Sequence, residues 1–443
     1  MISMLDRCKL TVKDFLSHYG MYYGNNSLHD LFQGFLGDME KGLAGEESSL
    51  QMIPTYLEDG QEIEVGKPVI AVDIGGTNVR VATICFDAAG NPEIADYQTY
   101  RTPGTHGEIP CSDFFRSIAS CLRPVLAKSD LIGCCFSFAT QPQANKDAIV
   151  VAAGKQLKVD GIVGKKFAEN LKMALKEENM DCNKKIVVLN DSVAAMLGGE
   201  TAQGKRKFGG HVGFIYGTGT NICYVEQNRN IRKICGADPD GQMIINVESC
   251  GYNGFQRGQI DREFDEMLID YGKDQYEKMV SGKYQGGLTL KVIQKAIGDG
   301  LFSNQFAEKA SRLSNLSSAE IDDFLNYPFG ENRLAWCCPT ECQGAKDDRK
   351  MLYYMIDALN ERSALLCSVV LGAVIWKAGI GRNPCLPAYV TAEGSTFYGS
   401  KNFRDKLNYY IRIFLNDKLG LYPEFFKVDD ATLIGTGIAG LTN

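Results

Sequence analysis

A glycine-rich hairpin pattern that occurs twice constrains the fold of this chain more than any other feature. Residues 69–86 contain two runs of β-forming side chains around the turn Gly-Gly-Thr-Asn. Residues 212–226 repeat the arrangement around Gly-Thr-Gly-Thr-Asn, so that Gly219 lies 143 residues after Gly76. Each pattern is typical of a β-hairpin. A repeat of this size predicts two lobes of similar topology, each with a glycine-rich hairpin.

Strand and helix patterns alternate between and after the two hairpins. Residues 131–138 and 186–189 are apolar runs that read as buried strands, and a helix is expected between them over about residues 163–178. Residues 351–376 predict a long helix, and residues 1–60 read as helices and loops. A chain of 443 residues is too long for one ordinary core. We therefore expect an α/β protein of two lobes joined by short hinge segments.

The charge and the apolar pattern argue against several classes of partner. The formal net charge is −7 and no long basic run occurs, so nucleic acid and anionic membranes are not expected to bind. The longest apolar stretches, such as residues 365–377, look too short and too interrupted to span a bilayer. Residues 1–20 lack the apolar region of a secretory signal. We therefore expect a cytoplasmic protein.

The 15 cysteines are scattered along the chain, and the densest group is Cys337, Cys338 and Cys342. A zinc site there would need further ligands at close spacing, and none is nearby in the sequence. We expect reduced structural thiols.

The two glycine-rich turns are candidate phosphate sites. Without a Cβ, the backbone can approach an anion closely and direct its N–H groups at it. Neither turn is a Walker loop, and neither is a dinucleotide fingerprint, because a strand follows each. An ordinary tight turn is the alternative for each one alone. The candidate residues are Gly75, Gly76, Thr77 and Asn78 in the first turn and Thr218 and Gly219 in the second.

Two aspartates lie where phosphoryl transfer needs a carboxylate. Asp191 follows an expected strand and begins an expected helix, so it is the candidate general base that accepts the proton of an attacking hydroxyl. A helix N-cap is its alternative role. Asp73 precedes the first glycine-rich turn, where it could hold Mg²⁺ through the water shell of the ion. The beginning of an ordinary turn is the alternative there.

Four further charged residues are weaker candidates. Lys155 and Arg80 could stabilise charge on a transferred phosphoryl group, and Glu248 and Glu277 could accept hydrogen bonds from sugar hydroxyls. Taken singly, each is as well explained as a solvated surface residue. The four histidines fall in no motif, so a His-dependent mechanism has no support.

In order and spacing, these segments resemble the eukaryotic-type hexokinase and glucokinase family. The resemblance covers nearly the whole chain, and its motifs in consistent order outweigh the alternative reading of each one alone. The matching segments are Met39, Gly42-Leu43, residues 52–56, Asp73 to Arg80, Phe136 to Phe138, Gly154-Lys155, Asn190-Asp191, Gly217 to Asn221, Asn246 to Glu248, Tyr276 to Lys278, and Lys283, Gly394, Ser395 and Thr432.

The resemblance implies a fold of the α/β class: the two-lobed actin-like ATPase (ribonuclease H-like) fold with an interlobe cleft. The smaller lobe would hold residues 67–191 plus 430–443, with the first phosphate loop and the catalytic aspartate. The larger lobe would hold residues 1–66 plus 192–429, with the second phosphate loop, the adenosine site and the sugar-binding glutamates.

The resemblance also implies an ATP-dependent hexokinase that phosphorylates the 6-hydroxyl of a hexose and feeds glycolysis. Glucose is the first candidate sugar, with mannose and fructose behind it, and the protein would be a monomer or homodimer that binds hexose and Mg-ATP. Asp191 would be the base, Lys155 and Mg²⁺ would neutralise developing charge, and Asp73 would hold the ion through water. The sugar would contact Ser137, Phe138, Asn190, Asn221, Glu248 and Glu277. The nucleotide would contact Gly75, Gly76, Thr77, Asn78, Arg80, Thr218, Gly219, Lys283, Gly394, Ser395 and Thr432.

The chain departs from the family pattern at four places. Gly154 replaces the usual Thr before Lys155, so one sugar-hydroxyl partner is missing. Ser249 follows Glu248 where the family has Trp. Thr432 lies between Ala and Leu where the family has Gly-Ser, which changes the adenosine end. The last helix of the smaller lobe looks short. The base and both phosphate loops remain, so we expect catalysis.

Three other readings stay open. A catalytically weak sugar sensor on the same scaffold would bind sugar without turnover. An actin-like ATPase would keep the phosphate loops but would have no need of Asn190, Glu248 and Glu277 together. A hexose with an amino or N-acetyl group at C2 is a third possibility, because Gly154 leaves room for it.

Overall fold

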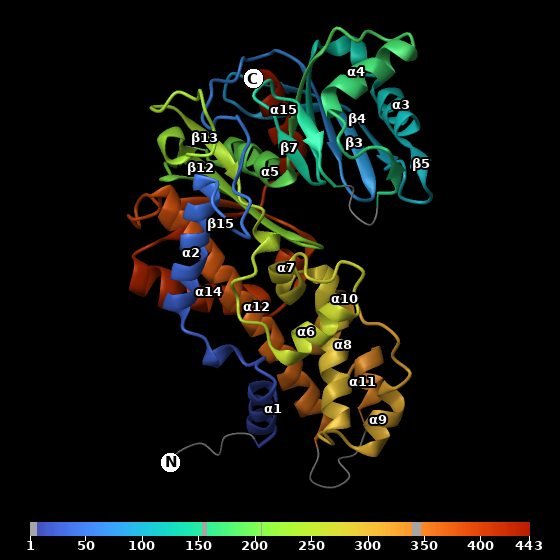
Figure 1. The fold of residues 1–443 in the computed structure, drawn as a ribbon, viewed down its shortest axis with the longest axis vertical. Coiled ribbons are helices and arrows are strands. Elements are labelled where there is room, and N and C mark those ends of the chain that lie inside the picture. Colours follow the sequence, from blue (N-terminus) through green and yellow to red (C-terminus); the bar gives the residue numbers. More distant parts are fainter. Residues whose placement is uncertain (1–6, 153–156, 205, 339–346) are drawn as a thin grey trace.

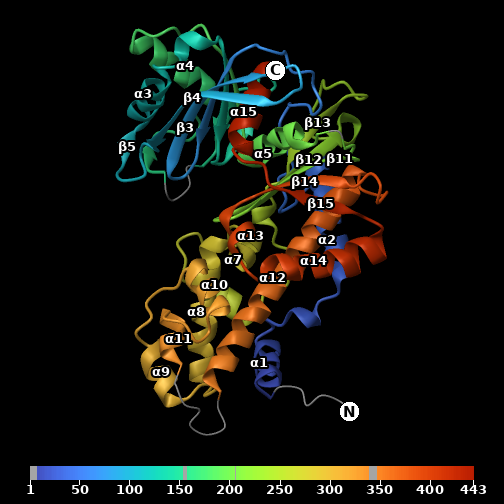
Figure 2. The ribbon, with the colours of Figure 1, turned by 180° about the vertical axis from the view of Figure 1, so that it is seen from behind.

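The computed structural model describes residues 7–152, 157–204, 206–338 and 347–443. Two β-sheets lie in the upper half of the molecule in Figure 1, and a helical region extends below them. Figure 2 shows the same arrangement from behind. The predicted α/β class is confirmed.

A five-stranded sheet has the order β10-β6-β2-β3-β4. The strands β2, β3 and β4 pair antiparallel, and β6 and β10 lie parallel to β2 on its other side. Helices α3 and α4 pack on one face of this sheet over an aromatic and aliphatic core, as Figure 1 shows. The bounds are β2 Val69–Ile74, β3 Asn78–Phe86, β4 Pro92–Arg101, β6 Leu131–Phe136, β10 Lys185–Leu189, α3 Cys111–Leu122 and α4 Phe167–Glu177.

A six-stranded sheet has the order β1-β13-β12-β11-β14-β15. Its hairpin β11–β12 is antiparallel, and β14 pairs parallel with β11. The helices α2, α12 and α14 contribute to the core beside this sheet. The bounds are β1 Ile53–Pro54, β11 Gly210–Tyr216, β12 Thr220–Gln227, β13 Gln242–Asn246, β14 Ala388–Glu393, β15 Pro423–Phe426, α2 Leu28–Ala44, α12 Asp348–Ala378 and α14 Phe403–Tyr410.

Two helices, α5 (Asp191–Gly199) and α15 (Ala431–Thr442), lie between the sheets (Figures 1 and 2). They pack against each other at van der Waals distance, because glycines line the contact. A Cβ on Gly435 would lie 1.8 Å from the carbonyl oxygen of Ala194, and one on Gly198 would lie 2.0 Å from that of Ala431. Any larger side chain at these two positions would push the helices, and with them the sheets, apart.

The helical region below the sheets has its own apolar core, to which α1, α6, α8, α9, α10, α11 and the first half of α12 contribute. The bounds are α1 Arg7–His18, α6 Gln259–Glu266, α7 Gln275–Val280, α8 Gly282–Gly298, α9 Asn304–Ala310, α10 Ser318–Asn326, α11 Arg333–Cys337 and α13 Ser395–Gly399. The short strands are β5 Ile109–Pro110, β7 Thr140–Pro142, β8 Ala148–Val150 and β9 Val159–Asp160, and a π-helical stretch covers Ile411–Leu419.

Helix α12 corrects the expectation that no segment could span a bilayer. Of the described residues, this one helix is long and apolar enough by length and composition, because the helix continues well beyond the apolar stretch at residues 365–377. Within its most apolar window, 83% of the residues are buried inside the protein, as in core helices of soluble proteins, so the span is weak support for a membrane contact.

Both predicted hairpins are confirmed, and the remaining predictions need local corrections. Helix α4 begins at Phe167, later than expected, and Lys166 just before it pairs with Ile149 in an isolated β-bridge. The strand expected over residues 131–138 ends at Phe136. The small strands β7 and β8 were not expected, because three residues each are too few for a readable alternation. The residue ranges assigned to the two lobes stay a prediction.

Candidate active site

The turn between β2 and β3 is the first predicted phosphate loop. The Gly75 N–H donates to the carbonyl of Asn78 at 3.0 Å and closes the turn. From the protein side, the Thr102 hydroxyl donates to the carbonyl of Gly75 at 2.7 Å, and the Thr102 N–H donates to the carbonyl of Thr77 at 3.0 Å. Thr77 and Asn78 are exposed. The loop is therefore fixed on one side and accessible on the other, as a phosphate loop requires.

The turn between β11 and β12 is the second predicted phosphate loop, and its surroundings are more crowded. The Gly217 N–H donates to the carbonyl of Gly219 at 2.9 Å. The carbonyl of Gly217 accepts from the N–H of Gly282, and the carbonyl of Thr218 accepts from the N–H of Lys283. The start of helix α8 is thereby tied to the loop.

Gly394 joins β14 to α13 beside the same loop. Its φ is +125°, which side chains rarely tolerate, and a Cβ there would lie 2.3 Å from the carbonyl oxygen of Tyr216. The hydroxyl of Thr396 in α13 donates to the carbonyl of Gly217 at 3.1 Å. Glycine at 394 therefore allows Ser395 and the rest of α13 to begin directly against the second loop.

An ion-pair cluster lies beside the first loop. Asp73 is buried at the end of β2, opposite Arg80 of β3. The Nε of Arg80 donates to Oδ2 of Asp73 at 3.0 Å, and Nη1 donates to Asp430 at 3.2 Å. Thr432, at the start of α15, accepts from Arg80 at 2.7 Å and donates to Oδ2 of Asp73 at 3.2 Å. The cluster joins the hairpin to the C-terminal helix, and two carboxylates and one hydroxyl hold Arg80 in place.

The residues near Asp73 fit a magnesium ion held through water. The hydrogen bonds to Asp73 fall on Oδ2, and the negative charge of Asp73 contributes to the raised pKa of Asp191. A divalent cation near both carboxyl groups would relieve the electrostatic effect of Asp73 on Asp191. Magnesium binds such carboxylates while keeping several waters and phosphate oxygens as its other ligands.

Asp191, the predicted base, is the first residue of α5. Asn190 is its N-cap, and the Asn190 side-chain oxygen accepts from the N–H of Ser192 at 3.0 Å and from its hydroxyl at 2.7 Å. The Ser192 N–H also donates to Asp191 at 2.8 Å. Burial, with the negative charge of Glu248 and then Asp73, raises the pKa of Asp191 to about 7. A carboxyl group with this pKa is matched to accept a proton near neutral pH.

A polar network extends from Asn190 along the second sheet. The side-chain N–H₂ of Asn221 lies 2.8 Å from Oδ1 of Asn246 and 3.4 Å from both Asn190 and Glu248. The side-chain N–H₂ of Asn246 donates to Oε1 of Glu248 at 2.7 Å. Burial raises the pKa of Glu248, although the hydrogen bond from Asn246 opposes the shift.

Glu248 has a left-handed backbone, with φ of +54°. A non-glycine residue in this conformation stores strain of about 1 to 3 kcal/mol, and such residues cluster at functional sites. The strain follows from the chain leaving β13 after Asn246 and turning sharply into a short 3₁₀ helix at Ser249. The turn brings the Glu248 side chain back to the amides of Asn221 and Asn246.

Glu277 lies in helix α7 and faces the second glycine-rich loop. The N–H of Thr220 donates to its Oε2 at 3.0 Å. A Cβ on Gly219 would lie 2.7 Å from the same oxygen, so glycine at 219 makes room for the carboxylate. Burial raises the pKa of Glu277 to about 7, against the opposing effect of the Thr220 hydrogen bond.

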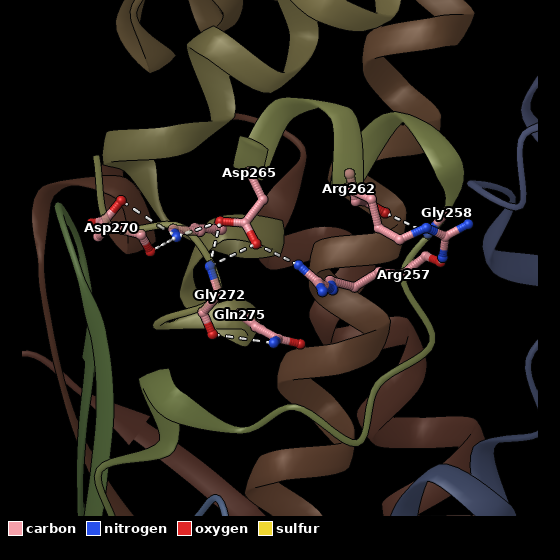
Figure 3. Close-up of polar contacts among 9 residues, drawn as sticks. Arg257, Gly258, Arg262, Asp265, Asp270, Gly272 and Gln275 are labelled. Atoms are coloured by element: carbon pink, nitrogen blue, oxygen red, sulfur yellow. Dashed lines mark hydrogen bonds and ion pairs between the residues drawn. The ribbon is translucent and has the colours of Figure 1, made fainter. Parts of the chain in front are cut away.

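Helix α7 is anchored by a buried ion-pair network next to Glu277 (Figure 3). The ammonium group of Lys278 lies 2.6 Å from Asp265 and 3.4 Å from Asp270. Asp265 also accepts from Arg257 at 2.7 Å. Lys278 and Asp265 are 4% and 1% exposed in their side chains, so the bond between them is shielded from water. The network fixes the register of α7 and so the direction in which Glu277 leaves it.

The remaining predicted residues fall in three groups. Ser137 and Phe138 follow β6, and the Ser137 N–H donates to the carbonyl of Ile74 at 3.2 Å, which holds this strand end beside the first loop. Lys283 is exposed, and its ammonium group lies 4.7 Å from the ring centre of Tyr284. Lys155 lies outside the described residues.

Sequence reasoning missed two residues of the site. Asn246 bridges Asn221 and Glu248, and its position two residues before a candidate glutamate was an available signal. Glu393 ends β14, and burial raises its pKa to about 7 while the positive charges of Arg80 and Lys427 oppose the shift. No sequence pattern predicted that Glu393 and Arg80 lie close, because the two strands belong to different sheets. The roles predicted above for individual residues stay predictions.

Two family models match the chain, and both are described as hexokinase. One covers residues 12–201 and the other residues 211–442. The chain is 26% identical over 430 residues to Hexokinase-1 of Schizosaccharomyces pombe, covering 93% of this chain and 86% of that protein. It is 27% identical over 398 residues to Hexokinase-1 of Homo sapiens, covering 86% of this chain but 43% of that protein. This chain thus spans less than half the length of the human relative.

Solved structures agree with these sequence matches. A hexokinase from Schistosoma mansoni complexed with glucose superposes with a TM-score of 0.78 at 22% identity, covering 99% of both chains. A second hexokinase crystal structure superposes with a TM-score of 0.71 at 20% identity, covering 97% of this chain and 95% of the other. The likeness confirms the predicted two-lobed actin-like ATPase fold. With nearly the whole sequence covered by two hexokinase models, the chain belongs to the hexokinase family.

Proposed function

We propose that this protein is an ATP-dependent hexokinase that transfers the γ-phosphoryl group of ATP to the 6-hydroxyl of a hexose. One observation carries the proposal: Asp191, with a pKa of about 7, lies at a helix start within the field of Glu248 and Asp73, next to an amide and carboxylate network. Sugar phosphorylation needs a general base next to groups that bind a polyol. ATP hydrolysis alone does not need such groups.

The sugar would bind at the polar network. Asn190, Asn221, Glu248 and Glu277 offer amide donors and carboxylate acceptors, and Ser137 and the backbone of Phe138 lie at a neighbouring strand end. In a closed site, leaving any of these groups without a hydrogen-bond partner costs free energy. A ligand with several hydroxyls is therefore favoured over one that lacks them. We take glucose as the first candidate, followed by mannose and fructose.

The reaction needs a proton acceptor at the attacking oxygen. Asp191 would accept the proton of the 6-hydroxyl as that oxygen bonds to the γ-phosphorus and the bond to the β-phosphate bridging oxygen breaks, which leaves ADP and the hexose 6-phosphate. Burial, together with the neighbouring carboxylates, raises the pKa of Asp191, which favours this transfer near neutral pH.

The two glycine-rich loops would receive the nucleotide. Gly75, Gly76, Thr77 and Asn78 on one side and Thr218 and Gly219 on the other offer backbone N–H groups and hydroxyls. Arg80, Lys155, Lys283, Gly394, Ser395 and Thr432 are the further proposed contacts. Magnesium, held by Asp73 through water, supplies neutralising charge on the phosphates when bound.

The cellular setting is part of the same proposal. We propose a cytoplasmic monomer or homodimer that supplies hexose 6-phosphate to glycolysis, without nucleic-acid or membrane partners. The net charge of −7 and the lack of a long basic run in the sequence support the absence of polyanionic partners.

The test is a coupled ADP-release assay with Mg-ATP and a panel of glucose, mannose, fructose, glucosamine and N-acetylglucosamine. The wild-type protein should release ADP in a sugar-dependent way, and Asp191→Ala should lose that release while retaining calorimetric sugar binding. Sugar binding without ADP release from the wild type would instead indicate a sugar sensor. ATP hydrolysis indifferent to every sugar would indicate an actin-like ATPase.

A further inference from the structure

Outside the site described above, three side chains with metal-binding groups converge from separate segments: Asp59, Glu200 and His211. Their ligand atoms all lie within 4.8 Å of one another. It is the one such group found among the described residues. Asp59 lies in the connection from β1 to β2, Glu200 follows helix α5, and His211 is the second residue of β11.

The imidazole faces both carboxylates through the same ring nitrogen. Nδ1 of His211 lies 2.9 Å from Oδ2 of Asp59 and 4.0 Å from Oε1 of Glu200. The three side chains are 12 to 15% exposed, so the cluster is largely shielded from water. No lysine or arginine of the described chain pairs with either carboxylate. The cluster therefore places two carboxyl groups around one imidazole.

Two oxygen atoms of this cluster have no hydrogen-bond partner among the described residues. These are Oδ1 of Asp59 and Oε1 of Glu200, and both are buried from solvent. Oε1 of Glu200 is the atom that points toward Nδ1 of His211. Buried carboxylate oxygens are normally hydrogen-bonded, and leaving one without a partner costs about 1 to 3 kcal/mol or more. A cation among these atoms would satisfy both oxygens.

We propose that Asp59, Glu200 and His211 form a binding site for a divalent transition-metal ion of the zinc class. One imidazole nitrogen with two carboxylate oxygens is a borderline donor set that favours zinc over magnesium or calcium, which prefer oxygen alone. Tetrahedral zinc ligands at about 2.0 to 2.2 Å from the ion lie about 3.4 Å from one another. The observed separations of 2.9 and 4.0 Å lie on either side of this value. A solvent molecule completes the coordination.

Gln203 orients the imidazole for this role. Its side-chain amide nitrogen lies 2.5 Å from Nε2 of His211, on the far side of the ring from the carboxylates. Without metal, the amide N–H₂ of Gln203 donates to Nε2, and Nδ1–H donates to Oδ2 of Asp59. A bound metal would displace the Nδ1 proton, and rotation of the Gln203 amide would let its oxygen accept from Nε2–H. Metal-bound histidines commonly donate their second N–H to such a partner, and removing the partner typically weakens binding 10- to 100-fold.

The place of the site in the fold gives the ion a structural consequence. Asp59 lies on a segment that joins the six-stranded sheet to the five-stranded sheet. Glu200 follows the helix that Asp191 begins, and His211 belongs to the six-stranded sheet. A bound ion therefore ties a connecting segment to the sheet and helix beside it, and it stabilises the folded protein in proportion to its affinity.

The experiment titrates the metal-free protein with zinc by calorimetry in 5 mM Mg²⁺, and compares it with His211→Ala, Glu200→Gln and Gln203→Ala. His29→Ala, a change at an exposed histidine, is the matched control. Because the cysteines can also bind zinc, the decisive quantity is the difference in stoichiometry between variants.

We expect wild type and His29→Ala to bind one more zinc ion than His211→Ala and Glu200→Gln. Gln203→Ala should retain that ion with affinity reduced 10- to 100-fold. Cobalt should replace zinc with a visible absorption band that His211→Ala lacks, and zinc should raise the melting temperature of wild type more than that of Glu200→Gln. Equal zinc stoichiometry in wild type and Glu200→Gln would overturn the proposal, and Glu200→Gln decides the matter if His211→Ala fails to fold. None of these readouts depends on kinase activity, so the metal site and the proposed function stand or fall separately.

Discussion

The two glycine-rich hairpins share a sequence pattern and a strand pairing, but they are built into different surroundings. The turn between β2 and β3 is open on one side, and beside it lies the ion-pair cluster of Asp73, Arg80 and Asp430. The turn between β11 and β12 is enclosed by the starts of α8 and α13, and it faces the carboxylate of Glu277. One hairpin thus lies beside ion pairs, and the other lies beside carboxyl groups that accept hydrogen bonds from amides.

From this difference we infer that the two hairpins bind different substrates. The ion pairs and exposed loop groups beside the β2–β3 turn suit a cation and phosphates. The buried carboxyl groups and side-chain amides beside the β11–β12 turn suit the hydroxyls of a neutral polyol. Burial is the largest cause of the raised pKa of Asp191, and the charges of Glu248 and Asp73 add to it. Asp191 therefore lies where the two environments meet. The comparison therefore predicts separable kinetic effects on the two sides and a common effect at Asp191.

The largest effect on kcat is expected from a substitution at Asp191. Asp191→Asn removes the proton acceptor but keeps the size of the side chain, so kcat should fall about 10² to 10⁴-fold while sugar affinity stays measurable. Steady-state kinetics with calorimetry check this. Asp429→Asn, at a carboxylate that is 91% exposed close in sequence to the cluster, is the control and should leave kcat unchanged. Near-wild-type turnover in Asp191→Asn would remove it from the base role.

The next largest effect should mark the second hairpin as the sugar side. Glu248→Gln keeps the shape of the side chain but removes the charged acceptor that Asn246 bonds at 2.7 Å. We expect KM for the hexose to rise about 10- to 100-fold, because hydrogen bonds to a charged group contribute about 1.5 to 3 kcal/mol. KM for Mg-ATP should change less than about 3-fold. An equal rise in KM for the hexose and KM for Mg-ATP would contradict the assignment of the sugar to this hairpin.

The converse effect should mark the first hairpin as the nucleotide side. Arg80→Lys keeps the positive charge but loses the fork that contacts Asp73, Asp430 and Thr432 together. KM for Mg-ATP should rise about 10-fold, with little change in KM for the hexose. Initial-rate measurements at saturating concentrations of the fixed substrate separate the two constants. A change confined to the hexose would reverse the assignment.

Sequence patterns predicted the parts of the site that lie on short segments, and missed what depends on distant pairing. The hairpins could be read from β-forming runs around glycine turns, and the resemblance located Asp191, Glu248 and Glu277. The contact between Arg80 and Asp430 joins residues 350 positions apart, and the approach of Glu393 to Arg80 depends on how two sheets face each other. No local pattern encodes either.

Contacts between distant segments also explain why no role was predicted for His211. His211 falls in no motif, yet the fold brings it against Asp59 and Glu200 from other segments. The positive φ of Glu248 was equally unreadable, because the sequence pattern favours glycine or asparagine at such positions, and only the surrounding contacts hold a glutamate there.

The smallest expected effect is on thermal stability. Asp191→Asn should lower kcat but raise the melting temperature, so the loss of activity cannot be ascribed to unfolding. A carboxyl whose folded pKa is raised to about 7 binds more protons in the folded than in the unfolded state between about pH 4 and 7. Wild-type stability should therefore fall as pH rises through this window, and the loss is complete above pH 7. Asp191→Asn avoids the cost, so at pH 8 its melting temperature should exceed that of wild type by about 2 °C or more.

Thermal unfolding at pH 8 and pH 4 checks this prediction. The gap between Asp191→Asn and wild type should be present at pH 8 and close at pH 4, where the wild-type carboxyl is protonated in both states. A variant less stable than wild type at pH 8 would contradict the raised pKa.

Phosphoryl transfer to the 6-hydroxyl of a hexose is best tested by identifying the product. Glucose and 6-deoxyglucose would each be incubated with Mg-ATP and the wild-type protein, and the products followed by proton–phosphorus correlation NMR. We expect a sugar phosphate whose phosphorus couples to the two C6 protons of glucose, and no phosphorylated product from 6-deoxyglucose. Phosphorus coupled to another position, phosphorylation of 6-deoxyglucose, or no sugar phosphate from any hexose would contradict it.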